Sequence, residues 1–457
     1  MKRDVCTIND LSNEEIEEIF DLADRFLAEM GKAERPHQIG GRRGDAIGQV
    51  MTSLFYEPST RTRFSFEAAM VRLGGSVLGT VDPVTSSAAK GESLADTVRV
   101  MENYADLIVM RHPYEGAARA ASEYVDIPVL NGGDGGHEHP TQTLCDLFTL
   151  RREHKSLKDL NVLLVGDLRN GRTVHSLVYG LARFKANIIP MPAKGFELPD
   201  HVGRRLQEEY HHHPYPKEAV FAGEEDLPPI DVVYVAPGSE LDLSAQGQVP
   251  AGADEDGAER RQKRALKFDV CYVTRLQGER LAPGQKLGTD YPVIDAKFLR
   301  GRRYRDTRVL HPLPRVNELG YDLDSDPRGV YFKQAAYGVP VRMALIAKVL
   351  GLMPFTSREA APQRKVYGHA EGLRCPNPRC ITQHPSEKAH LAPKFWFIRS
   401  TRALARCVYC ETDTEIARYG DMTTRKASSD FDRLPALAAG DVLLFASAED
   451  ARKAGYG

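Results

Sequence analysis

A run of hydroxyl and cationic side chains stands directly before an apolar helical pattern. Ser59, Thr60, Arg61 and Thr62 lie in the segment "EPSTRTRFSFE", residues 57–67. Backbone amides at the start of a helix have no partner within the helix and carry the positive end of its dipole, so they bind anions. Hydroxyl groups add hydrogen-bond donors, and a guanidinium adds a fixed cationic fork. The pattern predicts a phosphate site, although a capped helix with solvated arginines is the simpler alternative.

Further polar clusters occur at or near the carboxyl ends of strand-like runs, where α/β folds build ligand sites. Arg111 follows "ADLIVM", and "GGDGGHEHPTQTL" delivers His139 and Gln142 at a helix start after a glycine-rich turn. A histidine in that position, close to an amide donor, is suited to polarising a carbonyl group. The small-residue loop "SSAAKGESLADT" carries Ser86 and Lys90, which could move onto a ligand or simply be solvated.

Four of the seven cysteines form two close pairs near the end of the chain. Cys375 and Cys380 flank four residues, Cys407 and Cys410 flank two, and the 26 residues 381–406 separate the pairs. Four thiolates in two such knuckles can enclose a zinc ion tetrahedrally, and a closed site of this kind is structural rather than catalytic. In so short a segment the metal would supply much of the folding energy. The other cysteines are predicted to take no part: Cys6, Cys145 and Cys271.

Alternating strand-like and helical runs must position these residues. An amphipathic helix is predicted at 13–30, with apolar residues at helical spacing after an acidic first turn. Strands and helices then alternate to about residue 154, which predicts a parallel α/β sheet. The predicted strands are 49–56, 105–111 and 127–133, and the predicted helices are 64–74, 94–104 and 141–154.

A second α/β set begins at 161–167, an apolar run typical of a buried parallel strand, and continues in a helix at 173–184. Two similar strand-like runs, 230–237 and 268–275, flank a segment rich in glycine, aspartate and alanine, which we expect to be a mobile surface loop. The predicted fold class is α/β, with two doubly wound parallel-sheet domains and a small β-rich domain that binds zinc through four cysteines.

The composition excludes several classes of protein. The chain has 457 residues, 42% of them hydrophobic, which is too long for one ordinary core and fits two or three domains. Lysine and arginine total 61 against 63 acidic residues, so no overall charge attracts nucleic acid or an anionic membrane. We find no signal peptide or spanning helix and expect a cytoplasmic location. The histidines at 211–213 are interpreted as a solvated loop.

Seven segments, in order and spacing, resemble the transcarbamoylase family, and specifically its aspartate carbamoyltransferases. They are "FYEPSTRTRFSFE", "SSAAKGESLADT", "VMRHPYEGAAR", "GHEHPTQTLCDLFTL", "VGDLRNGRTVHSL", "VTRLQGERL" and "VLHPLPRVNEL", and the resemblance covers about residues 1–352. The "TRLQ" and "HPLP" segments favour aspartate enzymes over their ornithine-using relatives. The resemblance implies the transcarbamoylase fold and transfer of a carbamoyl group from carbamoyl phosphate to L-aspartate, a step of pyrimidine synthesis, without a catalytic cofactor.

The resemblance also implies roles for the matched residues. The phosphate would lie on residues 59–62 with help from Arg111, and the carbonyl oxygen would face Thr60, Arg111 and His139, where negative charge develops. Gln142 would bind the carbamoyl nitrogen. The implied carbamoyl-phosphate site comprises Ser59, Thr60, Arg61, Thr62, Ser86, Arg111, His139, Gln142, Leu313 and Pro314, and the implied catalytic residues are Thr60, Arg61, Lys90, Arg111 and His139.

L-Aspartate carries two carboxylates, which call for bidentate cations. By resemblance, Arg172 and Arg275 would bind them together with Gln277 and Lys90, whereas a structural ion pair is the alternative for each arginine. Ornithine would place an ammonium group against these arginines. Family members are trimers in which the counterparts of Ser86 and Lys90 reach in from the adjacent subunit, so the resemblance implies a homotrimer with shared sites.

The segment around the four cysteines resembles the zinc domain of the separate regulatory chain of some bacterial aspartate carbamoyltransferases. Only about 20 residues separate Cys375 from the catalytic part, which leaves no room for the nucleotide-binding domain of that chain. Regulation by nucleotides would therefore not use the usual site. The fused module is instead expected to dock on catalytic subunits and join trimers.

The predicted domains follow from these segments. They are a carbamoyl-phosphate domain at 1–150, an aspartate domain at 151–330 with an inserted loop at about 237–267, a closing helix at 331–352 that packs back on the first domain, a linker at 353–365, a zinc domain at 366–420, and a tail at 421–457 without a predicted function. Three alternatives stay open: a transcarbamoylase for another amine such as ornithine, a non-catalytic assembly subunit, and a zinc-ribbon protein that binds nucleic acid.

Overall fold

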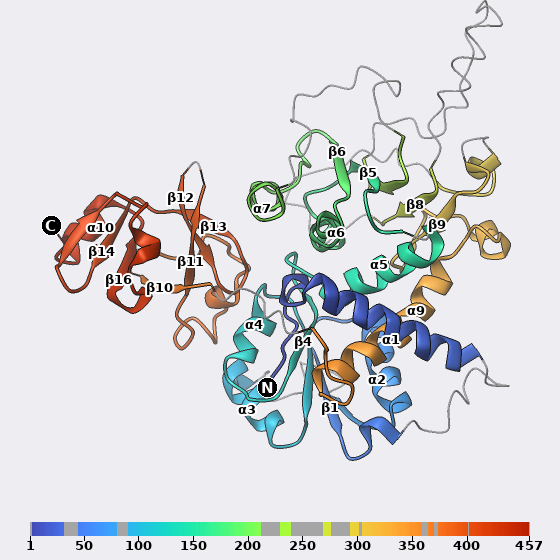
Figure 1. Cartoon of the computed structure of the whole chain (residues 1–457), viewed down its shortest axis with the longest axis horizontal. Helices are drawn as coiled ribbons and strands as arrows, with labels where there is room; N and C mark the ends of the chain where they lie inside the picture. The colour runs from blue at the N-terminus through green and yellow to red at the C-terminus, as the bar shows by residue number, and fades with distance from the viewer. Residues whose placement is uncertain are drawn as a thin grey trace, which may run out of the picture. The chain divides into compact units, whose positions relative to one another are not determined.

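The computed structural model contains two compact units (Figure 1). One comprises Met1–Thr141 with Arg342–Gly457, and the other comprises Gln142–Val341, so the division falls within helices α5 (Pro140–His154) and α9 (Tyr331–Val349). The structure describes residues 2–31, 44–79, 90–154, 156–211, 229–238, 268–275, 293–300, 304–357, 364–369, 373–400 and 402–456.

The first unit is built on a four-stranded parallel sheet with the strand order β2-β1-β3-β4. Strands β1 and β3 are almost entirely buried, as expected of a parallel sheet that is covered on both faces. Because the strands run in the same direction, their carboxyl ends meet at one edge. The elements are β1 (Val50–Phe55), β2 (Ser76–Gly79), β3 (Leu107–His112), β4 (Val129–Asp134), α1 (Asn13–Gly31), α2 (Thr60–Arg72), α3 (Leu94–Glu102) and α4 (Ala117–Ser122).

Local sequence explains where these helices begin. Ser93 caps α3, because its hydroxyl accepts a hydrogen bond from the amide of Asp96. Helix α2 begins at Thr60, four residues before the predicted start at 64, with Ser59 in the N-cap position. The earlier start places Thr60 and Thr62 in the first turn, where the helix dipole is most positive.

The second unit holds a five-stranded parallel sheet with the order β6-β5-β7-β8-β9. Its apolar core contains Leu163, Val233 and Cys271 from three neighbouring strands. Gly166 ends β5 at φ 92°, and a Cβ atom there would lie 2.1 Å from the carbonyl oxygen of Ala236, so this close approach requires glycine. The elements besides α5 and α9 are β5 (Asn161–Gly166), β6 (Asn187–Pro192), β7 (Val232–Val235), β8 (Val270–Val273), β9 (Arg308–Leu310), α6 (Arg172–Arg183) and α7 (Asp200–Tyr210).

These two sheets confirm the predicted α/β class with two parallel sheets. The two similar strand runs on either side of the predicted loop are neighbours, β7 and β8, paired in parallel. Nearly all of the predicted loop at 237–267 lies outside the described residues, as do Ser86, Gln277 and the histidines 212 and 213.

The C-terminal module is a β-rich domain whose sheet has seven strands in the order β13-β12-β11-β10-β16-β14-β15. Strand β10 pairs with β11 in antiparallel fashion and with β16 in parallel, so it joins the segment with the four cysteines to the tail. The tail, for which the sequence predicted no role, therefore completes this sheet. The elements are β10 (Val366–His369), β11 (Phe395–Arg399), β12 (Ala403–Cys407), β13 (Asp413–Glu415), β14 (Arg418–Asp421), β15 (Lys426–Ser428), β16 (Val442–Phe445) and α10 (Ala448–Lys453).

The module packs on helix α4 of its own chain, within the first unit. One buried cluster contains Ala117 and Ala121 of α4 together with Tyr409 of the module. Gly116 precedes α4 at φ 84°, and a Cβ atom there would lie 2.5 Å from the carbonyl carbon of Tyr409. The hydroxyl of Tyr409 also donates to Glu123 Oε2 over 3.1 Å. The contact is therefore apolar at its centre and requires glycine at position 116.

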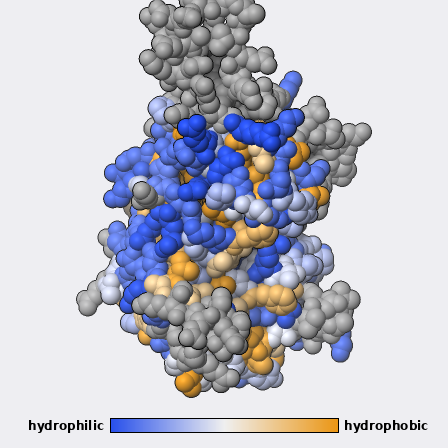
Figure 2. Space-filling model, turned by 90° about the vertical axis from the view of Figure 1, so that its right-hand side faces the viewer, coloured by the Kyte–Doolittle hydropathy of each residue, from blue (hydrophilic) through white to orange (hydrophobic). Residues whose placement is uncertain are grey.

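Within the described part of the chain, no helix combines the length and apolar character needed to cross a membrane. Figure 2 shows one face of the molecule, on which hydrophilic residues cover much of the described surface and hydrophobic residues form separate groups.

Candidate active site and metal centre

The start of helix α2 presents the predicted anion-binding residues. Ser59 takes the N-cap position, but its hydroxyl makes no capping hydrogen bond to the described helix, and Thr60 and Arg61 are exposed. Thr62 is buried, with 7% of its surface exposed. Because the cap leaves the first amides to other partners, this helix start can accept a phosphate group.

Arg111, near the end of β3, is held on two sides. Its Nη1 donates to the carbonyl oxygen of Gly132 over 3.1 Å, and its Nη2 forms an ion pair with Glu57 Oε1, in the loop that leads to α2. The side chain is 5% exposed, and a buried guanidinium needs such partners to offset its desolvation. Glu57 was not among the residues predicted from the sequence, because nothing in the local pattern indicates its partner.

His139 joins the α2 start to the start of α5. Its Nε2 lies 3.4 Å from Thr62 Oγ1, and its Nδ1 lies 3.4 Å from Thr141 Oγ1. A Cβ atom on Gly133 would lie 2.9 Å from Arg111 Nη1 and 3.2 Å from His139 Cδ2, so both side chains flank this one glycine. The structure thus brings together three residues predicted from separate segments: Thr62, Arg111 and His139.

The glycine-rich turn before His139 contains a buried ionic pair. Asp134 accepts hydrogen bonds from the amides of Gly116 (2.7 Å) and Glu138 (3.1 Å), and its Oδ2 lies 3.0 Å from His137 Nδ1. Burial lowers the pKa of His137, but the carboxylates of Asp134 and Glu411 outweigh it and hold the pKa well above its usual value. His137 is therefore a buried cation, which sequence reasoning did not identify.

Gln142 belongs to the second unit and is held by a buried carboxylate. Asp146, which is fully buried, accepts from Gln142 Nε2 over 2.9 Å, from Gln334 Nε2 over 2.8 Å and from the hydroxyl of Tyr272 over 3.0 Å. Burial and the nearby Asp146 carboxylate raise the pKa of Tyr272 well above 10, so this hydroxyl keeps its proton and donates. Gln334 in turn accepts from the amide of His311 over 2.9 Å. Asp146 thus connects Gln142 to the loop that contains Leu313.

The "HPLP" loop carries Leu313 and Pro314, joined by a cis peptide bond, with Leu313 at φ 54°. The amide of Leu313 donates to His311 Nδ1 over 2.8 Å, and His311 Nε2 lies 2.8 Å from Glu318 Oε1. Burial raises the pKa of Glu318, but the hydrogen bond from His311 outweighs it and the pKa is lowered. The buried pair of His311 and Glu318 therefore fixes the loop through the amide of Leu313.

The predicted aspartate-binding arginines occupy the carboxyl ends of strands in one parallel sheet. Arg172 begins α6 after β5, and Arg275 follows β8 by two residues. Both are partly exposed. Their predicted companion Lys90 lies in the first unit and is exposed, whereas Gln277 and Ser86 lie outside the described residues.

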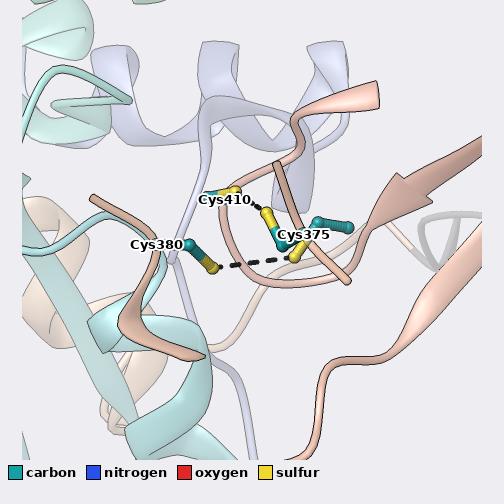
Figure 3. A group of neighbouring side chains, drawn as sticks. Cys375, Cys380 and Cys410 are labelled. Carbon is teal, nitrogen blue, oxygen red and sulfur yellow. Dashed lines mark hydrogen bonds between the residues drawn. The ribbon is translucent and has the colours of Figure 1, made fainter. Parts of the chain in front are cut away.

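The four cysteines of the module converge on one point (Figure 3). Their sulfur atoms all lie within 4.8 Å of one another, with 3.4 Å between Cys375 and Cys410 and 3.8 Å between Cys380 and Cys407. All four side chains are buried, and the hydroxyl of Thr382 donates to Cys380 Sγ over 3.2 Å. Four thiolates at this spacing fit a metal ion with no position left for a substrate.

Three families match separate parts of the chain. The family "Aspartate/ornithine carbamoyltransferase, carbamoyl-P binding domain" matches residues 3–152, and the family "Aspartate/ornithine carbamoyltransferase, Asp/Orn binding domain" matches residues 243–349. The family "Aspartate carbamoyltransferase regulatory chain, metal binding domain" matches residues 364–418. That match ends before the last strands of the module, so residues 419–457 lie outside the matched region.

Individual relatives are similar over about three quarters of the chain. An aspartate carbamoyltransferase catalytic subunit of Clostridium botulinum is 42% identical over 344 residues, which is 75% of this chain and 96% of the relative. The catalytic subunit of the M. jannaschii aspartate transcarbamoylase aligns with a TM-score of 0.58 and 38% identity, over 76% of this chain and 98% of that one. The Trypanosoma cruzi aspartate transcarbamoylase in complex with carbamoyl phosphate and aspartate gives a TM-score of 0.56 and 32% identity, over 76% and 95%.

Proposed function

The chain belongs to the aspartate carbamoyltransferase family, and we propose from this membership that it transfers the carbamoyl group of carbamoyl phosphate to L-aspartate. The products are N-carbamoyl-L-aspartate and phosphate, as in pyrimidine synthesis. The observation that carries the proposal is the convergence of Thr62, Arg111 and His139 beside Gly133, at the edge of the first sheet where the α2 helix start lies.

The phosphate would bind at the start of α2. The first amides of that helix donate to it, and the hydroxyls of Ser59, Thr60 and Thr62 and the guanidinium of Arg61 add side-chain donors. Arg111, already oriented by Glu57, would contact the same group from the neighbouring strand. The site would therefore hold the leaving group before the amine attacks.

The reaction forms a bond between the amine nitrogen and the carbonyl carbon and breaks the bond from that carbon to the phosphate oxygen. Negative charge develops on the carbonyl oxygen, where Thr60, Arg111 and His139 would donate. Gln142, held by Asp146, would bind the carbamoyl nitrogen. The amine loses a proton, which the departing phosphate can accept, so the step needs neither a covalent intermediate nor a catalytic cofactor.

L-Aspartate would be held by the arginines of the second sheet. Arg172 and Arg275 offer bidentate contacts to two carboxylates, and Lys90 and Gln277 would complete the site. Leu313 and Pro314 would contribute backbone contacts around the carbamoyl nitrogen of the other substrate. The relatives named above are aspartate enzymes, which disfavours the ornithine alternative. The regulatory-chain match of the module likewise favours a metal domain of this family over a zinc ribbon that binds nucleic acid.

The metal of the C-terminal module is proposed to be a structural Zn²⁺ held by Cys375, Cys380, Cys407 and Cys410, because soft thiolate ligands in a closed tetrahedral set select it. The enzyme is proposed to be a homotrimer, or a multiple of trimers joined through the module, with Ser86 and Lys90 completing the site of the adjacent subunit. The domain boundaries and the cytoplasmic location given above remain predictions.

Phosphate release from carbamoyl phosphate tests the proposal. We expect the purified full chain to release phosphate in the presence of L-aspartate and not with L-ornithine or without an amine. Arg61→Ala should abolish the release, since loss of one such donor commonly lowers the rate on the order of a hundredfold or more. Arg402→Ala, at an exposed ion pair of the module, is the matched control and should retain full activity. Release with ornithine alone would contradict the assignment of Arg172 and Arg275.

A further inference from the structure

The metal-binding module contacts the turn that leads to His139. His137, two residues before His139, places its Nε2 3.4 Å from Glu411 Oε2 and its Nδ1 3.0 Å from Asp134 Oδ2. Glu411 directly follows Cys410, one of the four converging cysteines. One side chain therefore connects a cysteine knuckle to the turn.

The other cysteine knuckle reaches the same turn through Glu115. The Oε2 of Glu115 accepts from Asn377 Nδ2 over 2.6 Å, and its Oε1 accepts from the amide of Gly136 over 3.1 Å. Asn377 stands between Cys375 and Cys380. The backbone of Glu115 also bonds to the module on both sides, with its amide donating to Arg379 over 2.8 Å and its carbonyl accepting from Ile381 over 2.9 Å.

Hydrogen bonds hold the backbone of the turn in place, because its glycines do not restrict it by themselves. Gly133 and Gly135 both have positive φ, at 115° and 48°, and glycine gives the backbone more freedom than any other residue. Asp134 fixes the turn locally through the amides of Gly116 and Glu138. Because Asp134 is also bonded to His137, the local hydrogen bonds and the contact with Glu411 form one continuous network.

The position of this turn matters for chemistry. Gly133 lies against Arg111 and His139, so a shift of the turn would move both side chains. A displacement of about 1 Å at reacting groups can lower a rate on the order of a hundredfold. A module that holds the turn would therefore act on turnover without touching a substrate.

We propose that His137 is a positioning residue that couples the metal-binding module to the active site of the same chain, so that metal binding in the module raises the rate of carbamoyl transfer. This inference rests on the function proposed above. It gives the fused module a task within one subunit, in addition to any part in assembly. The module holds the turn through the contact between His137 and Glu411 and through the contacts of Glu115. A single substitution can remove the contact between His137 and Glu411.

The first test compares the kinetics of full-chain variants. His137→Gln and Glu411→Gln should each lower kcat roughly tenfold, less than a full 1 Å displacement would, because Glu115 still holds the backbone. KM for aspartate should stay within about twofold, since the arginines proposed to bind aspartate are not part of this turn. The double variant should be no slower than either single variant, because both substitutions break the same contact between His137 and Glu411. Lys394→Ala removes a different contact of the module, to Glu123 over 2.8 Å, and should leave kcat unchanged.

The second test measures hydrogen–deuterium exchange in peptides covering residues 131–139. Exchange should rise in His137→Gln with metal bound, and also in the wild-type chain after the metal is removed with a chelator. Strand β12 (Ala403–Cys407) should stay protected in His137→Gln, which establishes that the module is still folded.

The outcomes separate this inference from the proposed function. A wild-type chain that uses aspartate, together with unchanged kcat and exchange in His137→Gln, would overturn the coupling and leave the function intact. An equal loss of kcat in Lys394→Ala would also overturn it, because docking in general would then account for the effect. A metal-loaded wild-type chain without carbamoyl transfer would instead refute the proposed function.

Discussion

The buried carboxylate of Asp146 is expected to hold the second unit together as well as Gln142. In Asp146→Ala, three donors lose their acceptor: Gln142 Nε2, Gln334 Nε2 and the hydroxyl of Tyr272. A buried donor without a partner costs about 1–3 kcal/mol, so Gln334 and Tyr272 together would cost about 2–6 kcal/mol, and the partly exposed Gln142 adds less because water can reach it. A water molecule admitted to the vacated space would satisfy some of them, which favours the lower half of that range.

Asp146→Asn is the matched control, because the amide can reproduce most of the network. Its oxygen can replace Oδ1 and accept from both glutamines. Its nitrogen would then face Tyr272, whose hydroxyl can turn to accept instead of donate. We therefore expect Asp146→Asn to cost about 1 kcal/mol, the value of one altered hydrogen bond.

Calorimetry of the full chain would measure this difference. At about 2–4 °C per kcal/mol for a unit of this size, Asp146→Ala should lower the unfolding temperature of the second unit by at least roughly 4 °C, and by about twice as much as Asp146→Asn or more. Phosphate-release kinetics on the folded variants should show a lower kcat for Asp146→Ala, since Gln142 loses its anchor. Equal losses of stability in the two variants, or a loss below about 1 kcal/mol in Asp146→Ala, would refute the argument from orphaned donors.

Two further predictions follow from the contacts of the first unit. Glu57→Ala should lower kcat roughly tenfold, because without this carboxylate the guanidinium of Arg111 can turn away from the developing oxyanion. Glu57→Gln keeps a hydrogen-bond acceptor and should lose less of its kcat. Equal kinetics in the wild type and both variants would contradict this role of Glu57. Glu18 makes stability depend on pH, because burial raises its pKa but hydrogen bonds from Lys348 and Thr356 outweigh it and lower the pKa from 4.5 to about 2. The contribution of Glu18 to stability should be fully present above pH 4.5 and be lost as the pH falls toward 2. The difference in urea midpoint between the wild type and Glu18→Gln should therefore shrink from pH 5 to pH 3. A constant difference would count against this role of Glu18.

The sequence was sufficient to predict the parallel sheets and part of the candidate site. Apolar runs such as 161–167 mark buried parallel strands, and polar residues directly after such runs must meet at the carboxyl edge of a sheet. This reasoning anticipated that Arg111 and His139 would lie close together. The cysteine spacing likewise anticipated the convergence of the four sulfur atoms.

The remaining contacts could not be predicted because they depend on pairs far apart in the chain. Asp146 lies in an apolar helical run, and its partner Gln334 is 188 residues away. His137 and Glu411 are 274 residues apart, and neither stands in a pattern that indicates the other. The tail joins its sheet through β16, whose partner β10 lies before the four cysteines. Such pairs follow from tertiary packing, which local periodicity does not encode.

Direct observation of the product tests the central claim. Carbamoyl phosphate labelled with carbon-13 would be incubated with the purified full chain and an equal mixture of L-aspartate and L-ornithine, and the labelled products would be identified by mass spectrometry. We expect the label to appear in N-carbamoyl-L-aspartate and Arg61→Ala to form almost none of this product. Label found on ornithine, or on neither amine while the chain is folded and metal-loaded, would contradict it.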